Sequence, residues 1–536
     1  ADSNVVVGYR ALTSDTLGSK SVAIGDQALE NQNFTTATSV YNVAVGASAG
    51  NAITTGVRNT LIGAFAGDGL TTGSNNIAIG LNALTTEDAG DFNIAIGSET
   101  LEAQDAGDAY NIAIGYAAGK AITTGTINTL IGGECGNALT SGNSNTAVGF
   151  KALNDDTKGD RNIAIGAGAL QVQNFTTSTD SHNIAVGYDA GNDITTGVQN
   201  VLLGGLAGQK LSDADFNIAI GTSALATDTL GSRSVAVGIS ALATQNHTTA
   251  TDVYNTCVGA LAGTSITDAV RNTIIGGLAG DAITSADFNV AVGYGALSSE
   301  ILGERAVAVG YHALLTQQRT TASQSNNVAV GFQSGANVTT GDENVFIGSD
   351  AGTGMTTAAN CVIVGHSSSA SAFNGNGQIV IGHSITGGGN NTVRLGTTGG
   401  GTATLSLDGS DTSWAAASDE RLKKDIADST VGLSFINALR PVTFKWNAKN
   451  AIADSLPQYD ADSSDPVYGE GKAHHGFVAQ EVKAVIDANS DVVDGHNIWV
   501  EDPDGTQQVA PSALIPMLVK AIQELSAEVE KLKSGG

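Results

Sequence analysis

Basic residues are scarce in this sequence of 536 residues. Lysine and arginine together number 24 against 52 aspartates and glutamates, which gives a formal net charge of −28. A protein that binds nucleic acid or anionic lipid needs a clustered basic surface, and this chain cannot assemble one. The charge balance therefore excludes nucleic-acid binding as its main role.

Cysteines and long apolar runs are also few. Cys135, Cys257 and Cys361 are far apart and form no C-x-x-C pair, so we expect buried apolar thiols, with no disulfide framework, metal site or cofactor. No stretch approaches the roughly 18 apolar residues of a membrane helix, and no basic segment followed by an apolar one marks an export signal. We predict no membrane insertion. Residues 4–8 (NVVVG) already belong to a repeat, which is compatible with an anchoring segment upstream.

Proline and tryptophan are absent from most of the chain. All six prolines and all three tryptophans lie beyond residue 410, whereas 61 of the 69 glycines precede residue 418. Two physically different regions therefore follow one another. We predict a repeat region at 1–365, a degenerate repeat and Gly-rich transition at 366–417, and a globular domain at 418–536.

The first region repeats the pattern Asn-Ile-Ala-Ile-Gly, as at residues 76–80 and 217–221. The motif glycines follow one another at steps of 17 residues, lengthened to 21 four times and to 18 once, and four steps form a super-repeat of 72 residues. Order at two levels predicts a solenoid in which each coil contributes a strand. We expect each glycine to close its strand at a positive φ or a close backbone approach, and each asparagine to serve as a turn residue.

The strands of this pattern are apolar on both faces. Ile-Ala-Ile places two large β-branched side chains on one face and the small one on the other. A single solenoid needs only an apolar interior, so its second apolar face requires a cover. We interpret that cover as sister copies of the chain.

Four insertions of four residues recur as near-copies of one loop, and we expect them to protrude in a row along one edge. Their third position varies and gives four candidate receptor-contact residues: Phe34, Phe175, His247 and Arg319. A ridge that merely stiffens the shaft is the alternative. The acidic loops, such as 86–91 (TEDAGD), are interpreted as a solvated face, with calcium binding as an alternative.

The repeat motif resembles that of the left-handed parallel β-roll heads of trimeric autotransporter adhesins, whose coils carry a similar Asn-x-Val-Ala-Ile-Gly core. The resemblance covers roughly residues 4–365 and implies a homotrimer. The coil of 17 residues is longer than the family repeat, so we expect larger loops at one edge.

Three blocks in the last region carry a second resemblance: residues 418–426 (SDERLKKDI), 439–446 (LRPVTFKW) and 474–482 (HHGFVAQEV). They are similar to the C-terminal intramolecular chaperone domain of phage tail spikes and fibres, the endosialidase type. That resemblance implies trimer assembly followed by one self-cleavage between Ala417 and Ser418. It assigns Ser418 as nucleophile, Lys423 as base and His474 to a supporting role, and the shaft shows no constellation of a turnover enzyme.

The end of the chain predicts a helix over 512–533. Its apolar residues are spaced by three and four as in an a/d heptad seam: Ile515, Leu518, Ile522, Leu525, Val529 and Leu532. A trimeric coiled coil is one interpretation, and a single amphipathic helix on a globular core is the other. The expected fold is thus mainly β, a left-handed parallel β-roll or β-solenoid trimer with a C-terminal α+β chaperone domain.

The function that these features favour is a phage tail fibre or spike. Such a virion protein would be assembled in the host cytoplasm and would attach to a host cell-surface receptor, a glycan or an outer-surface protein. A bacterial trimeric surface adhesin with a retained trimerisation cap is the first alternative. An ice-binding solenoid is the second, although Thr-Thr-Gly recurs only about once in four coils.

Overall fold

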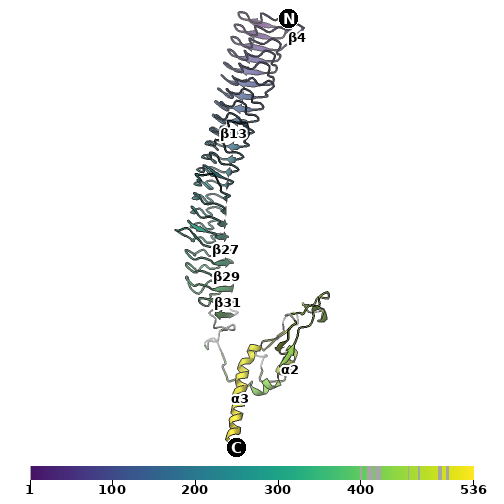
Figure 1. Cartoon of the computed structure of the whole chain (residues 1–536), viewed down its shortest axis with the longest axis vertical. Helices are drawn as coiled ribbons and strands as arrows, with labels where there is room; N and C mark the ends of the chain where they lie inside the picture. The colour runs from purple at the N-terminus through teal and green to yellow at the C-terminus, as the bar shows by residue number, and fades with distance from the viewer. Residues whose placement is uncertain are drawn as a thin grey trace. The chain divides into compact units, whose positions relative to one another are not determined.

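A computed structural model describes residues 2–398, 401–406, 415–416, 420, 424–454, 456, 458–468, 471–492, 498–501 and 506–535. The chain divides into two compact units, Ala1–Ala417 and Ser418–Gly536. The first is a long parallel β-solenoid of about 23 turns (Figure 1). The second is a small unit with a long C-terminal helix.

Each coil of the solenoid contributes a short strand to one continuous ladder. Neighbouring strands pair in parallel at the sequence period, so that Ala219 lies opposite Ala236 and Leu202 opposite Ala219. The strands of this ladder are β1 (Val5–Val7), β3 (Val22–Ile24), β5 (Val43–Val45), β6 (Thr60–Ile62), β7 (Ile77–Ile79), β8 (Ile94–Ile96), β9 (Ile112–Ile114), β10 (Thr129–Ile131), β11 (Thr146–Val148), β13 (Ile163–Ile165), β15 (Ile184–Val186), β16 (Val201–Leu203), β17 (Ile218–Ile220), β19 (Val235–Val237), β21 (Thr256–Val258), β22 (Thr273–Ile275), β23 (Val290–Val292), β25 (Val307–Val309), β27 (Val328–Val330), β28 (Val345–Ile347), β29 (Val362–Val364), β30 (Ile379–His383) and β31 (Thr392–Thr397).

The long coils add a second pair of strands, and the ladder ends in an antiparallel turn. The paired strands of the long coils are β2 (Gly18–Ser19) with β4 (Thr38–Ser39), β12 (Gly159–Asp160) with β14 (Thr179–Asp180), β18 (Gly231–Ser232) with β20 (Thr251–Asp252), and β24 (Gly303–Glu304) with β26 (Ser323–Gln324). After β31 the chain reverses into β32 (Gly401–Ser406) and β33 (Ala415–Ala416), which pair antiparallel.

The strands place their small residue inside and their large residues outside. Ala219 is fully buried, whereas Ile218 and Ile220 on either side are 37% and 38% exposed. Because side chains alternate along a strand, the same division recurs in coil after coil. An apolar outer face therefore runs along the solenoid, and within one chain it is open to solvent.

The motif asparagines form a hydrogen-bonded ladder inside the solenoid. The backbone N–H of Asn217 donates to Oδ1 of Asn200 at 3.0 Å, and Nδ2 of Asn217 donates to the carbonyl oxygen of Gly231, also at 3.0 Å. Equivalent bonds repeat in successive coils, where these side chains are buried. Each asparagine thus satisfies backbone groups of two neighbouring coils, which a surface turn residue would not do.

The third and fourth residues after the motif glycine are Ala-Gly in one pair of coils (190–191 and 207–208) and Ala-Leu in the next pair (224–225 and 241–242). This alternation has a packing reason. A Cβ atom at Gly191 or at Gly208 would lie 2.6 Å from a methyl group of Leu202, so Leu202 fills the space that these two glycines leave. In the coils with an Ala-Leu ending, Leu225 and Leu242 occupy that space, and the facing strand residue is an alanine. The interior volume is therefore conserved from coil to coil.

The motif glycine meets both of the expected requirements. Gly221 has a φ of 131°, and a Cβ atom there would lie 2.5 Å from the carbonyl oxygen of Gly238 in the next coil. No other residue fits such a contact.

The second unit combines short strands with helices around its own core. Its elements are α1 (Leu433–Ala438), β34 (Val442–Phe444), η2 (Lys449–Ala451), β35 (His474–Gly476), α2 (Ala479–Asp487), β36 (Trp499–Glu501), β37 (Gln507–Val509), η4 (Pro511–Leu514) and α3 (Ile515–Ser534). Phe435, Val482, Ile498 and Met517 lie in the core. The N–H of Leu433 at the start of α1 donates to the Glu524 carboxylate on α3 at 2.7 Å, which favours the helix terminus.

Candidate functional sites

The residues at which the family resemblance implies cleavage are only partly described. Ala417, Ser418 and Lys423 lie outside the described residues, and their predicted roles stay predictions. His474 is described. It begins β35, which pairs antiparallel with β34 so that His474 lies opposite Phe444.

His474 stands in an aromatic cluster. Its ring centroid lies 5.7 Å from that of Phe444 and 6.5 Å from that of Trp446, and Trp446 lies 4.9 Å from Tyr468. The Nε2 atom of His474 is buried and has no hydrogen-bond partner among the described residues. Because an unpaired buried nitrogen is costly, this atom is suited to hold a polar group brought beside it.

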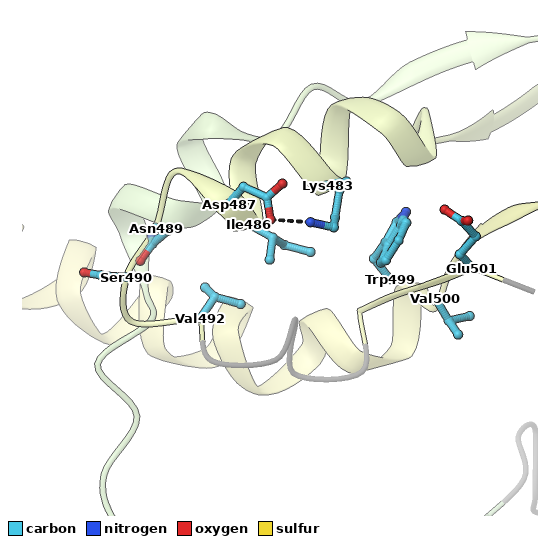
Figure 2. A pocket seen from close by; sticks show the side chains of 9 residues that line it. All are labelled: Lys483, Ile486, Asp487, Asn489, Ser490, Val492, Trp499, Val500 and Glu501. Carbon is cyan, nitrogen blue, oxygen red and sulfur yellow. Dashed lines mark hydrogen bonds and ion pairs between the residues drawn. The ribbon is translucent and has the colours of Figure 1, made fainter. Parts of the chain in front are cut away.

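A depression of about 600 Å³ lies between α2 and β36 (Figure 2). Lys483 forms an ion pair there with Asp487, and its Nζ atom lies 5.2 Å from the centroid of the Trp499 ring. Figure 2 shows Ser490 at the far end of the depression, beyond Asn489. Lys483 is thus held by Asp487, and the Ser490 hydroxyl lies away from it. The two side chains are therefore not placed to act as a base and a nucleophile.

Helix α3 has two apolar faces. Met517 and Ala521 are buried against the core of the unit. The residues of the predicted heptad seam face elsewhere and are exposed, with Ile522 at 65% and Leu532 at 79%. The core of this unit is therefore covered by residues of α3 other than the seam, and no described residue of the chain covers the seam.

The four variable loop residues are less exposed than expected. Phe34, Phe175 and His247 are buried, and the side chain of Arg319 is 11% exposed. Arg319 donates to the carbonyl oxygens of Thr340 and Gly341, so it ties the loop to the following coil. This burial speaks against a direct receptor contact through these four side chains and fits the alternative of a structural ridge.

Each variable residue lies beside a carboxylate, which is buried at Asp156, Asp228 and Glu300 and half-buried at Asp15. The backbone N–H of Phe175 donates to Asp156, and that of His247 donates to Asp228 at 2.9 Å. The same carboxylates accept from a buried glutamine one coil further on, with Gln173 at 2.7 Å from Asp156. The other such pairs, each joining two coils, are Asp15 with Gln32, Glu87 with Gln104, Asp228 with Gln245 and Glu300 with Gln317.

The pKa values of two of these carboxylates are shifted in opposite directions. Burial raises the pKa of Asp156 above the ordinary aspartate value, and its hydrogen bonds do not offset this. Burial would do the same at Asp228, but the nearby His247 and Gln245 outweigh it and lower the pKa of Asp228. At His247, the Asp228 carboxylate likewise outweighs burial and raises the imidazole pKa. These pairs were missed from the sequence, although their constant place seven residues after the motif glycine was a signal.

The acidic loop 86–91 uses its carboxylates to bridge coils. Glu87 accepts from the backbone N–H of Gly90 and from the amide of Gln104, and Asp88 accepts from the Thr71 hydroxyl. Across the described ranges, no group of three potential ligands could hold a metal ion. The threonines of Thr-Thr-Gly behave alike: the hydroxyl of Thr195 donates to the Ser212 carbonyl of the next coil. These side chains serve the stacking of coils.

Comparison with known proteins identifies the second unit. The family model described as chaperone of endosialidase matches residues 418–491. The C-terminal region therefore carries a chaperone-of-endosialidase domain, which follows a β-solenoid shaft. No curated protein matches the chain. No helix in the described part of the chain has the length and apolar character needed to cross a bilayer.

Proposed function

We propose that the chain is one copy of a homotrimeric fibre of the phage tail-fibre or tail-spike type. In this proposal the C-terminal unit brings three copies together, and the shaft reaches a receptor on the host surface. The observation that carries it is the apolar outer face, which recurs from coil to coil and which no described residue of the chain covers. A contiguous apolar surface of this extent is typical of an interface.

The exposed seam of α3 supports the same assembly. Ile515, Leu518 and Ile522 continue into an a/d pattern that parallel helices bury between them. The helix also packs on its own unit through Met517, so the seam of each copy is already folded and exposed before the copies associate. The chaperone-of-endosialidase match at 418–491 supports an assembly role for this unit.

Self-cleavage is the second part of the proposal. Lys423 takes the proton of the Ser418 hydroxyl, whose oxygen attacks the carbonyl carbon of Ala417. The bond from that carbon to the Ser418 nitrogen then breaks, and the nitrogen takes the proton from Lys423 and becomes a free amine, which leaves Ala417 as an ester on the Ser418 oxygen. Water hydrolyses this ester to the Ala417 carboxyl group and the free Ser418 hydroxyl. A lysine at its ordinary pKa of about 10.4 is protonated near neutral pH, so this step needs a local lowering of the Lys423 pKa. His474 is half-buried, and its buried Nε2 atom, which has no partner among the described residues, suits it to position one of these groups.

Intact and native mass spectrometry of the expressed chain test the proposal. We expect trimers, and cleavage of the 536-residue chain into a shaft of 417 residues and a C-terminal fragment of the remaining 119, which is 536 minus 417. Ser418→Ala and Lys423→Ala should each give uncut trimers. Lys424→Ala is the matched control, because the Lys424 side chain is 90% exposed and we expect its variant to be cut.

The outcomes separate the two parts. A parent chain that stays monomeric of about 53.7 kDa refutes the fibre assembly. A parent chain that forms trimers but is never cut refutes self-cleavage alone, and it favours a retained trimerisation cap as in a surface adhesin.

A further inference from the structure

Two columns of side chains border the apolar outer face. The pre-strand column consists of the residue five positions before each motif glycine, and the post-strand column of the residue directly after it. In the coil of Gly259 these are Tyr254 and Ala260. Tyr254 is 50% exposed, and in the post-strand column Phe150 is 56% exposed.

The pre-strand column carries bulky residues in a conformation that disfavours them. Phe216, Arg233, Tyr254 and Arg271 all have φ near 60°, the left-handed region that glycine and asparagine usually occupy. The Arg233 guanidinium lies 4.9 Å from the Phe216 ring centroid and 5.8 Å from that of Tyr254, so the side chains stack along the column. Their outward surfaces remain exposed, and the fold of one chain does not require their size.

The two columns are complementary in size within a coil. In most coils with a large pre-strand residue the post-strand residue is small, as in the pairs Tyr41 with Ala47, Phe92 with Ser98 and Arg271 with Gly277. Where the pre-strand residue is small the order reverses, as in Ser144 with Phe150 and Asn326 with Phe332. One further coil pairs opposite charges, Lys20 with Asp26.

Contacts within one chain cannot explain this complementarity. The two residues of a pair are six positions apart and flank the same three-residue strand, so they are separated by more than about 10 Å and by at most about 20 Å. Each column instead contacts itself from coil to coil, as in the stacked rings of Tyr294 and Tyr311, whose centroids are 5.8 Å apart. The pre-strand and post-strand residues of one coil can therefore contact each other only if they belong to two different copies of the chain.

We infer that parallel copies of the shaft pack edge to edge in register, with the pre-strand column of one copy against the post-strand column of the next at the same coil. This inference rests on the proposed trimer and adds its contact edges and register. A cyclic arrangement satisfies it, because each copy then offers one edge to each neighbour. The Ile and Val columns between the two edges become the buried centre.

Some coils place large residues at both edges, and they fit the same arrangement. Tyr110 with Tyr116 and Phe288 with Tyr294 would form aromatic pairs between copies, and Arg305 with Tyr311 a cation–π contact. His182 with Tyr188 and Arg233 with Ile239 are the other two such coils.

Engineered disulfides test the register. Gln199→Cys with Gly205→Cys places two thiols at the edges of one coil, too far apart within a chain to bond, since a disulfide needs Cα atoms within about 7 Å. A Cβ at Gly205 would meet its nearest neighbour at 4.0 Å, so cysteine fits there. The native thiols Cys135, Cys257 and Cys361 are buried and do not compete.

The matched control moves one thiol by two coils, as Gln199→Cys with Ile239→Cys, which offsets the pair by about 10 Å along the shaft. After mild oxidation we expect the matched variant to give covalent trimers on a non-reducing gel, and the offset variant and both single variants to give none. Native mass spectrometry of the same samples reports assembly independently.

Each result decides one statement. Trimers by native mass without a covalent product in the matched variant, or with as much in the offset variant, overturn the inferred register and leave the proposed trimer standing. Monomers in all variants and in the parent overturn both.

A charge exchange gives a second measurement that needs no oxidation. Lys20→Asp would oppose two carboxylates between copies and should lower the thermal midpoint of the trimer, whereas Lys20→Asp with Asp26→Lys should restore it. No restoration by the double variant contradicts the pairing of these two edges.

Discussion

The buried Gln317 provides the sharpest test of how the coils hold one another. Its Nε2 donates to Oε2 of Glu300 at 2.8 Å, and its Oε1 accepts from Nδ2 of Asn327, also at 2.8 Å. The side chain thus joins three coils. Gln317→Leu keeps the volume and removes both bonds, while Gln318→Leu changes an exposed side chain and is the matched control.

The magnitude follows from the partners that are left behind. A hydrogen bond to a charged group contributes about 1.5–3 kcal/mol and one between neutral groups about 1 kcal/mol, and both stranded partners are buried. We expect a loss of about 3 kcal/mol in the free energy of local opening, which corresponds to about 100-fold faster amide exchange. Hydrogen-exchange mass spectrometry of residues 300–305 and 317–327 measures it.

The result depends on comparing the two neighbouring variants. Gln318→Leu should exchange like the parent, because its side chain holds no buried partner. If Gln317→Leu also exchanges within about threefold of the parent, the buried carboxylate and amide pairs do not hold the coils together. That outcome would refute the account of the interior.

Two further predictions concern the shaft. Ala219→Asp buries a charge inside a coil and should lower the strand signal in circular dichroism through the loss of neighbouring coils. Ile218→Asp lies on the outer face and should lower only the trimer fraction in native mass spectrometry, so an equal loss of strand signal in both variants contradicts the assignment of faces. His247→Phe removes a pair whose stabilisation is present while His247 is protonated and is lost as the pH rises through its raised pKa, so between about pH 6 and about pH 9 the thermal midpoint of the parent should fall more than that of the variant.

The backbone of the shaft could be predicted from the sequence because its chemistry is periodic. The motif glycines fix the register, and the structure confirms a mainly β, parallel solenoid with strands such as β17 at that period. The C-terminal chaperone domain was also recognisable, since all three of its blocks lie within residues 418–491, the region that the family model matches. The assignment of Ser418 as nucleophile and of Lys423 as base depends on that resemblance alone.

The direction of side chains at the turns could not be predicted in the same way. Phe175 and His247 occupy the same position in two of the repeated loops, and the change from an apolar to a polar residue there is typical of a surface site. The loop instead turns both side chains inward, beside Asp156 and Asp228. Asn217 looked like a turn residue because asparagine is frequent in turns. Its place in an internal ladder depends on the coil above, and no local pattern reveals that.

The interior and the outer face of the shaft pose different problems for assembly. Inside a coil, bonds such as that between Gln173 and Asp156 involve residues that change between coils, so stacking within one chain has a single register. On the outer face isoleucine and valine predominate, with threonine or leucine in a few coils, and a slip by one coil would bury these side chains almost as well. In the proposed trimer, register must therefore come from features that vary along the shaft. The two bordering columns vary in this way, and they would preserve the register after the C-terminal unit had established it and been cut away.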